Sequence, residues 1–419
     1  MAKRSSLIVL ALLVVVVFCS AVVGATTLNV LHMIQSGYSV EEIESITAEF
    51  EAENPGVKVN LLFIPFDALH DKIVTAAATR SSAYDVTLID CIWPPEFASA
   101  GFVVDVTDKM AEVNTDDIFQ GVLDSVKYDG KYWGMPWLND IKYLFYNTRM
   151  LAEAGFDNPP ETWGELVEQA KVIKEMGLVE YPIVWCWAQI EAVVCDFTAL
   201  AAGFGGEILT LDEENKVVLN EELGLEVLEF MVETIETGIT NPSSREFSEE
   251  DVRRVFSQGE AAFALNWTYM YNSANDPAES AVAGDVDIAV VPGTDKAFSG
   301  TVNGGMGLSI LSGSKHPDEA WDYIQHMTSK EVQIQYSDNA LPIYISAFSD
   351  PRVIADQPRL VEVSETQYGY VVNRPQVTWY PELSEVLRVE IQKVLLGSKS
   401  PADAIATIAA ETKKLEARQ

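Results

Sequence analysis

From Thr26 onward the chain alternates short apolar strands with amphipathic helices, and this alternation limits the possible folds more than any other feature. Residues 28–31 predict a first strand and residues 85–89 a third, while alternate apolar positions over 57–63 predict a strand between them. Helices fit the two intervals. A strand–helix–strand–helix–strand order produces a parallel sheet with helices on both faces, so the sequence predicts an α/β fold.

The two intervening helices have recognisable ends. Ser39 and Glu42 have the spacing of a capping box, in which each side chain bonds the other residue's backbone N–H, so the first helix begins there. The turn-forming run Asn54–Gly56 ends it. A second helix is predicted over about residues 68–79.

The rest of the chain continues the alternation. A length of 419 residues exceeds what one ordinary core accommodates, so we expect two lobes. The aromatic stretch 128–137, with Asp-Gly near its start, predicts a hairpin or a strand that crosses from one lobe to the other. Further helices are predicted over 191–202, 221–236 and 248–257 and from Thr162 and Ser400 onward, and strands over 183–186, 261–265 and 286–290.

The N-terminal segment up to Ala25 differs from the rest. Lys3 and Arg4 precede an apolar run from Leu7 to Phe18, and small residues follow. This is the layout of a secretory signal peptide, and the run is shorter than the roughly 20 apolar residues that span a bilayer. We predict export to the periplasm or cell surface with cleavage after Ala25; the alternative is lipidation at Cys19.

Acidic residues outnumber basic residues by 63 to 28, which gives a formal net charge of −35 at pH 7. Such a charge repels nucleic acid and anionic lipid, and no cluster of Lys and Arg interrupts it. The composition therefore excludes nucleic acid as a partner and favours a neutral or cationic ligand.

The cysteines and histidines give no sign of a metal site. Cys91, Cys186 and Cys195 lack metal-ligand spacing, and the four histidines are scattered. Cys186 and Cys195 either pair as a disulfide or remain buried thiols. The glycine-rich stretches 203–206 and 304–307 fit loops better than phosphate sites, and no hydrolase signature is present. No catalytic residue, metal or cofactor is predicted.

Aromatic residues lie beside carboxylates or amides at several predicted loop positions. A sugar presents an apolar C–H face, which a flat ring covers, and a rim of hydroxyls, which carboxylates and amides bind. Any single tryptophan is equally explained by core packing. Four such groups together favour a sugar site: Asp90 with Trp93, Trp137 with Asn139 and Asp140, Trp187 with Glu191, and Asn266 with Trp267 and Tyr269.

Six stretches spread over the chain carry a family resemblance: 84–108, 128–166, 191–206, 256–270, 304–310 and 374–387. The most specific is 128–166, YDGKYWGMPWLNDIKYLFYNTRMLAEAGFDNPPETWGEL. These stretches resemble the solute-binding proteins of carbohydrate ABC importers, the family that includes maltose-binding protein, and are most similar to its trehalose/maltose-binding branch.

The resemblance implies a two-lobed periplasmic-binding-protein fold of type II, in which each lobe is a mainly parallel sheet flanked by helices. A multi-strand hinge joins the lobes, and the solute binds in the cleft. We expect lobe one to comprise residues 26–135 and 294–340, and lobe two residues 136–293 and 341–419.

The resemblance also implies roles for single residues. Asp90, flanked by Trp93, and Asp140 match acceptors of sugar hydroxyls. Trp267 and Tyr269 match the platform on which a pyranose stacks, and two positions apart in an extended segment both can point the same way. In addition, Arg374 matches a donor to sugar oxygens.

Five other positions complete the expected site or depart from the family pattern. Gly305 matches a backbone contact, and Glu191, with Trp187 nearby, stands where that branch also has a glutamate. Gln35, after the first strand, replaces a common glutamate, and Met306 replaces an expected aromatic. These two departures leave the particular sugar open.

Together these features predict one principal function and two alternatives. The principal one is a monomeric receptor that binds a mono- or oligosaccharide such as maltose or trehalose, catalyses no reaction, and delivers the sugar to the permease subunits of an ABC importer. The alternatives are a binding protein for a cation such as a polyamine, and a secreted glycosidase that uses two cleft carboxylates. The arginine at position 374 favours a sugar over a polyamine.

Overall fold

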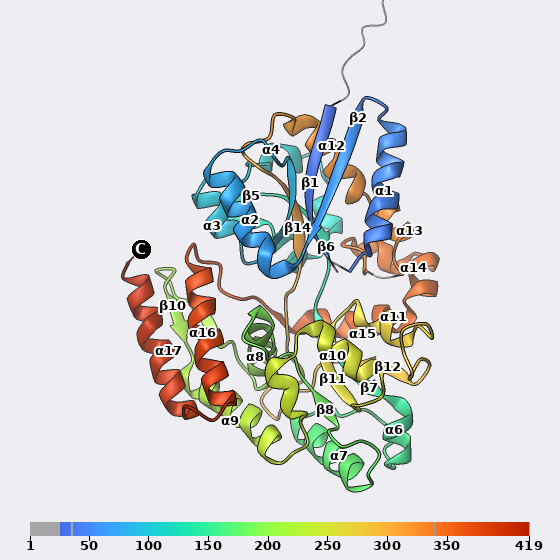
Figure 1. The fold of residues 1–419 in the computed structure, drawn as a ribbon, viewed down its shortest axis with the longest axis vertical. Coiled ribbons are helices and arrows are strands. Elements are labelled where there is room, and N and C mark those ends of the chain that lie inside the picture. Colours follow the sequence, from blue (N-terminus) through green and yellow to red (C-terminus); the bar gives the residue numbers. More distant parts are fainter. Residues whose placement is uncertain (1–25, 35–36, 339, 419) are drawn as a thin grey trace, which may run out of the picture.

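The computed structural model of the chain describes residues 26–34, 37–338 and 340–418, so the predicted signal peptide and Gln35 lie outside the described residues. Within them the chain builds two main sheets, one above the other in Figure 1, with helices packed around each.

Sheet I contains the three strands predicted at the start of the chain. β1 (Thr26–Met33) lies between β2 (Val57–Ile64) and β3 (Val86–Asp90) and pairs with both in parallel. β14 (Met306–Ile310) pairs antiparallel with β3 and with β6 (Met135–Leu138), which gives the order β2-β1-β3-β14-β6. The sheet therefore joins the start of the chain to a strand from its last third.

The first helix, α1 (Val40–Glu53), begins where its capping box was predicted. Ser39 Oγ accepts from the backbone N–H of Glu42, and the Glu42 carboxylate accepts from the backbone N–H of Ser39. Side chains on one face, including Ile43 and Phe50, are buried in the core. The helix thus covers sheet I with its apolar face.

The aromatic stretch 128–137 begins with the hairpin that the sequence allowed, but it does not cross between the two halves. β4 (Lys127–Tyr128) and β5 (Lys131–Tyr132) make a hairpin whose turn residues, Asp129 and Gly130, have φ values of 51° and 72°. Two positive φ values are the requirement of the tight turn that matches strand twist, which explains the Asp-Gly pair. The chain then enters β6 of sheet I.

Sheet II has the order β12-β7-β11-β8. β7 (Lys142–Asn147) pairs antiparallel with β11 (Phe263–Trp267) and β12 (Val286–Ala289), and β8 (Ile183–Val184) pairs in parallel with β11. In each main sheet one strand, β14 or β7, runs against the others, which all share a direction. The predicted α/β class with mainly parallel sheets is confirmed.

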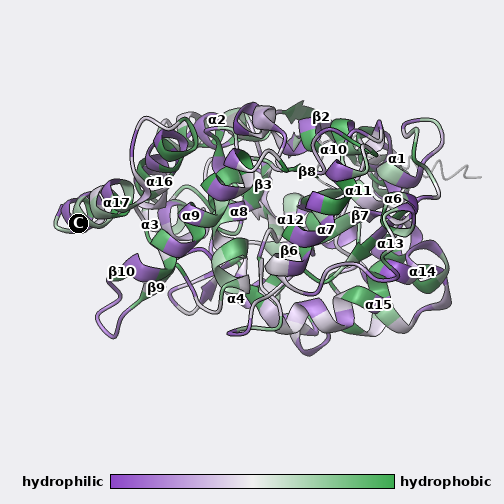
Figure 2. Ribbon diagram, turned by 90° about the horizontal axis from the view of Figure 1, so that it is seen from below, coloured by the Kyte–Doolittle hydropathy of each residue, from purple (hydrophilic) through white to green (hydrophobic). Residues whose placement is uncertain are grey.

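Helices and short strand pairs complete both halves. Beside sheet I lie α1, α2 (Phe66–Ala78), α3 (Pro94–Ser99), α4 (Thr107–Met110), α5 (Gln120–Asp124), α12 (Pro317–Met327) and α13 (Lys330–Gln335). The half with sheet II contains α6 (Thr148–Glu153), α7 (Trp163–Glu175), α8 (Glu191–Gly203), α9 (Glu221–Glu236), α10 (Glu249–Ser257), α11 (Met270–Asn275), α14 (Pro351–Asp356), α15 (Pro358–Gln367), α16 (Tyr380–Leu395), α17 (Pro401–Glu416) and the pair β9 (Leu209–Leu211) and β10 (Val217–Leu219). Peripheral helices such as α14 and α17 carry both hydrophilic and hydrophobic residues (Figure 2), as expected for helices with one buried face.

Three chain segments lie side by side where the two halves join. β13 (Thr301–Val302) pairs in parallel with β15 (Val371–Val372), and the backbone N–H of Asn303 donates to the carbonyl of Val372 at 2.9 Å. The N–H of Gly304 donates to the carbonyl of Asp140 at 2.9 Å. We propose these segments as the hinge, and the lobe boundaries given above remain a prediction.

Candidate functional site

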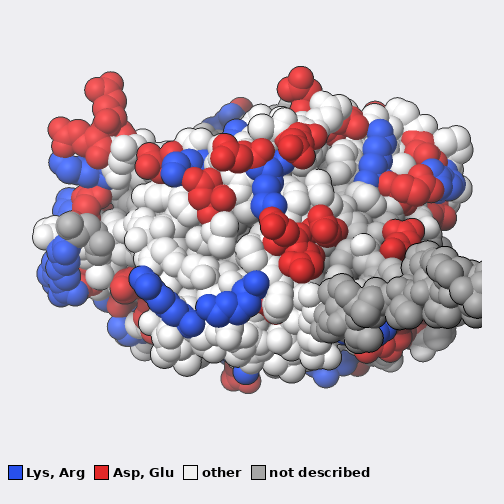
Figure 3. Space-filling view, turned by 90° about the horizontal axis from the view of Figure 1, so that it is seen from above, with Lys and Arg blue, Asp and Glu red and all other residues white. Residues whose placement is uncertain are grey.

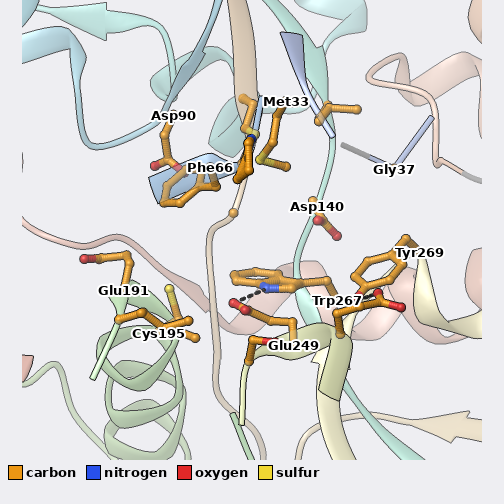
Figure 4. A pocket seen from close by; sticks show the side chains of 18 of the residues that line it. Met33, Gly37, Phe66, Asp90, Asp140, Glu191, Cys195, Glu249, Trp267 and Tyr269 are labelled. Carbon is orange, nitrogen blue, oxygen red and sulfur yellow. Dashed lines mark hydrogen bonds between the residues drawn. The ribbon is translucent and has the colours of Figure 1, made fainter. Parts of the chain in front are cut away.

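A cavity of about 350 Å³ lies between the two sheets, and side chains from both halves line it (Figure 4). Residues from sheet I and its connections form one wall, and residues from sheet II, α8 and α10 form the other. The lining residues include Met33, Phe66, Asp90 and Met306 on the first wall, Asp140, Glu191, Cys195, Glu249, Glu250, Trp267 and Tyr269 on the second, and Gly304 and Arg374 at the junction.

Trp267, the last residue of β11, holds a flat ring against the cavity. Lys142, its fully buried partner on β7, places Nζ 4.8 Å from the ring centroid. The indole N–H donates to Glu249 Oε1 at 3.4 Å. Gly304 leaves room for the ring edge, since a Cβ at that position would lie 2.5 Å from Cζ3 of Trp267. The ring is therefore fixed in orientation while it still lines the cavity.

Tyr269 also lines the cavity, but the extended backbone predicted between it and Trp267 is wrong. β11 continues to Trp267, two residues beyond the predicted strand, because it pairs with β7 as far as Lys142. Tyr269 then adopts helical dihedral angles, φ −57° and ψ −28°, and precedes α11. Its hydroxyl donates to Glu250 Oε2 at 3.4 Å, and burial raises the pKa of this phenol.

Asp90 ends β3 and lies at the carboxyl edge of sheet I. Its Oδ1 accepts from the backbone N–H of Ile92 at 3.2 Å and from the Cys91 thiol at 3.3 Å. Arg374 Nη2 lies 3.4 Å from the same oxygen. Burial raises the pKa of the Asp90 carboxyl, and the positive charge of Arg374 opposes this rise.

Arg374 connects the two walls of the cavity. Its Nη1 donates to Glu191 Oε1 at 2.8 Å, and its Nη2 also donates to the carbonyl of Asn303 at 3.2 Å. Glu191 additionally accepts from the Tyr380 hydroxyl at 2.6 Å and from Ser384, both on α16. Glu191 is thus largely engaged by the protein itself, and its main role in this structure is to hold Arg374 in place.

Asp140 follows β6 in the first of the three joining segments. The backbone N–H of Thr268 donates to its Oδ1 at 3.0 Å. Burial raises the pKa of the Asp140 carboxyl to about 6, and the Thr268 hydrogen bond offsets this rise only in part.

A raised pKa at Asp140 predicts a specific pH dependence of stability. Because about 6 exceeds the value near 3.9 of an unfolded chain, the folded protein holds the proton more tightly. Its stabilising contribution is present at low pH and is lost as pH rises through 6. Asp140→Asn removes this titration. The free energy of unfolding of the empty variant, relative to the parent, should therefore rise by about 1 kcal/mol from pH 5 to pH 8 in urea denaturation. A pH-independent difference would contradict the raised pKa.

The structure brings most, but not all, of the predicted site residues together. Trp93 and Trp187 are 4% and 0% exposed and do not line the cavity. Trp93 stacks on Phe66, whose ring does reach the cavity, at 5.4 Å between centroids, and Trp187 stacks on Trp185 at 5.0 Å. Gly305 donates its N–H to Asn303 Oδ1 at 2.8 Å, and Gly304 lines the cavity in its place.

Sequence reasoning missed several residues that line the cavity, three of which bear on its chemistry. Phe66 and the adjacent acids Glu249 and Glu250 line it, yet none was selected. The two acids are the first residues of α10, a helix that was predicted correctly. Their position directly after the capping residue Ser248 was the only sequence signal that they lie at a helix end. Nothing in the local sequence indicated that this helix end faces Trp267.

The three cysteines of the described residues are not paired. Cys91, Cys186 and Cys195 are buried free thiols, so the alternative of a Cys186–Cys195 disulfide is wrong.

The described residues also lack the features of a metal site or a membrane-spanning helix. Within residues 26–34, 37–338 and 340–418 no group of His, Cys, Asp or Glu has the geometry to hold a metal ion. Every helix in the described part of the chain is too short or too polar to cross a bilayer. The face seen from above carries acidic groups interspersed with basic side chains, without a large basic patch (Figure 3).

Comparison with known proteins agrees with this geometry. Residues 36–334 match the family model described as bacterial extracellular solute-binding protein. The solved structure of maltose-bound MalE3 from T. maritima is 31% identical, with a TM-score of 0.87 over 93% of this chain and 100% of that chain. An ABC transporter solute-binding protein from Thermotoga lettingae, bound to α-D-tagatose, is 26% identical, with a TM-score of 0.83 over 93% of this chain and 99% of that chain.

A curated relative covers nearly the same part of the chain. It is named a probable ABC transporter-binding protein of Deinococcus radiodurans and is 26% identical over 387 residues, 88% of this chain and 90% of that protein. These matched proteins are binding proteins, not enzymes, and the resemblance to the solute-binding family is confirmed, while the trehalose/maltose-binding branch remains a prediction. The family match, the two-sheet architecture and the cavity between the sheets agree, and the chain belongs to the bacterial extracellular solute-binding proteins.

Proposed function

We propose that this protein is the sugar receptor of an ABC importer and delivers its ligand to the membrane permease. One observation carries the proposal: the cavity combines an aromatic ring of fixed orientation, Trp267, with carboxylates and a guanidinium from both halves of the molecule. The ring covers the C–H face of a pyranose, and Asp90, Asp140 and Arg374 bind its hydroxyls. The maltose in MalE3 and the tagatose in the T. lettingae protein support this class of ligand.

The position of the cavity suggests how binding is signalled. Ligand that contacts both walls stabilises the arrangement in which the two halves approach, so binding shifts the hinge equilibrium toward closure. Asp90 and Asp140 serve in this proposal as ionised acceptors of hydroxyl hydrogen bonds. We propose further that the protein is exported and monomeric, and that its ligand is a small mono- or oligosaccharide, with maltose, trehalose and their substituted derivatives as the first candidates.

A thermal-shift screen tests the function directly. A ligand that binds only the folded state raises the melting temperature by mass action, by an amount that grows with its concentration relative to Kd. The panel contains maltose, trehalose, glucose, tagatose, cellobiose and the polyamine spermidine. A concentration-dependent shift with at least one sugar supports the proposal. A shift with spermidine and with no sugar in a wider panel would show that the class of ligand is wrong.

Gly304→Ala tests whether the orientation of the Trp267 ring matters. The new methyl group would meet the ring edge at 2.5 Å, so the indole must move from its place against the cavity. Overpacking of this kind costs about 1–3 kcal/mol of folding stability. Sugar affinity by titration calorimetry should fall by more than about 1 kcal/mol, because the displaced ring no longer covers the pyranose face.

Gly121→Ala is the matched control for this variant. Its added methyl group has no atom within 4 Å, so affinity should stay at the parent value. Parent-like affinity of Gly304→Ala would mean that the ring does not carry the sugar.

A further inference from the structure

The carboxylates of the cavity outnumber its cations. Five acidic side chains line it, Asp90, Asp140, Glu191, Glu249 and Glu250, against one basic side chain, Arg374. Arg374 is already shared between Glu191 at 2.8 Å and Asp90 at 3.4 Å. The single guanidinium is therefore balanced by the protein before any ligand enters.

Two of the acids have no cation in contact. Glu250 is paired with Arg253, which lies outside the cavity lining. For Asp140 and Glu249, no Lys or Arg nitrogen of the described residues lies within 4.0 Å of the carboxylate. Neutral groups donate hydrogen bonds to these carboxylates instead: the Thr268 backbone N–H to Asp140 and the Trp267 indole N–H to Glu249.

These two carboxylates approach Trp267 from different sides. Figure 4 shows Asp140 above the indole ring and Glu249 below it, with Tyr269 beside them. Lys142, whose Nζ lies 4.8 Å from the ring centroid, makes its direct ion pair with Asp196. Its charge acts on Asp140 and Glu249 only over a longer range. The charge of Asp140 and Glu249 is thus directed toward the space that a ligand stacked on Trp267 would occupy.

The negative charge of Asp140 and Glu249 should favour binding of a basic sugar over a neutral one. When the halves close around a ligand, both carboxylates lose water, and a hydroxyl supplies a hydrogen bond but no compensating charge. An ammonium group supplies both, and it forms the stronger, charge-assisted hydrogen bond. Burial raises the pKa of the Asp140 carboxyl, and the Thr268 hydrogen bond and the more distant charge of Lys142 offset this rise only in part.

We propose that the solute is a basic sugar, an amino sugar or aminocyclitol glycoside, whose ammonium group binds between Asp140 and Glu249 beside the Trp267 ring. This inference rests on the proposed sugar-binding function and narrows it to a charged ligand class. Arg374, held by Glu191 and Asp90, remains available at the junction for the neutral hydroxyls of the same ligand.

Matched pairs of sugars that differ only in having amino groups in place of hydroxyls test the proposal. Glucosamine is compared with glucose, 2-amino-2-deoxytrehalose with trehalose, and the β-1,4-linked glucosamine dimer with cellobiose. Titration calorimetry at pH 6.5 keeps the amines protonated. In at least one pair we expect the amino sugar to bind about tenfold or more tightly than its hydroxyl counterpart, the scale of a desolvated charge pair.

Glu249→Gln shows whether this carboxylate provides the selectivity. The variant should remove most of the preference within the pair, because the amide carries no charge to pair with the ammonium, while its oxygen still accepts from the Trp267 indole N–H. Glu260→Gln, an exposed acid outside the cavity lining, removes the same charge from the protein and should leave the preference intact.

The outcomes separate this inference from the function on which it rests. Equal or tighter binding of the hydroxyl sugars overturns the basic-sugar proposal and leaves the sugar receptor standing. Equal weakening of both pair members by Glu249→Gln also overturns it, because Glu249 would then act only as a hydroxyl acceptor. Binding of spermidine without binding of any sugar, or of no probe at all, overturns both.

Discussion

Trp267→Ala is expected to weaken sugar binding by about 2–4 kcal/mol, the scale of an interface hot spot. The ring lines the cavity at the end of β11, where Lys142, Glu249 and Gly304 fix its orientation. Alanine removes the whole apolar surface that would cover a pyranose face. The neighbouring carboxylates then face a sugar that no aromatic ring holds in position. Titration calorimetry with the best sugar from the screen measures the loss.

Trp185→Ala provides the opposite control. Trp185 is 1% exposed, stacks on Trp187 and donates its indole N–H to Thr240, so it belongs to the core. Its replacement should cost about 3–5 kcal/mol in the free energy of unfolding, with near-normal affinity in the protein that still folds. Trp267→Ala should destabilise the empty protein clearly less than this. If Trp267→Ala instead lowers stability as much and spares affinity, Trp267 is a core residue.

Lys142→Met is expected to lower the free energy of unfolding by about 3–5 kcal/mol, the cost of breaking a buried ion pair from one side. Lys142 and Asp196 are both fully buried and in direct contact. Burial lowers the pKa of the lysine, but the charge of Asp196 more than compensates, so the pKa is raised and the ammonium stays charged. Without it, the Asp196 carboxylate is left in the interior with no cation.

The double variant Lys142→Met/Asp196→Leu separates charge from packing. It removes both charges, so most of the lost stability should return, as measured by urea unfolding at pH 7. Its sugar affinity should remain below that of the parent because Trp267 has lost the cation behind its ring. If the double variant is no more stable than Lys142→Met alone, the destabilisation does not come from the uncompensated charge of Asp196.

Local interactions explain what could be predicted before the fold was known. The capping box of Ser39 and Glu42 and the Asp129–Gly130 turn depend on residues next to one another in the sequence. The helix predicted over 221–236 forms over the same residues. Its apolar side chains recur with the period of a helix and so lie on one face, which can pack against any apolar surface. Asp90 and Trp267 were found for a related reason, since strand ends are recognisable from sequence and ligands bind there.

Errors arose wherever a residue's environment depends on distant parts of the chain. Trp93 and Trp187 have the same kind of local sequence as Trp267, yet they pack into the core, because burial of an aromatic ring is decided by what the rest of the chain places over it. The β11 boundary shifted because pairing with Lys142, more than a hundred residues away, extends the strand to Trp267.

The sequence by itself determined the α/β class, most helix and strand positions and the strand ends at which cavity-lining side chains lie, because periodicity, capping and turn chemistry act over a few residues. The family followed separately, from the resemblance of six stretches of the chain. Only the tertiary structure decided which charges meet. Arg374 reaches Asp90 across 284 positions of sequence, and Glu249 is placed against Trp267 by the packing of α10 beside β11. Electrostatic balance in a cavity is a property of distances in space, and the fold alone sets these distances.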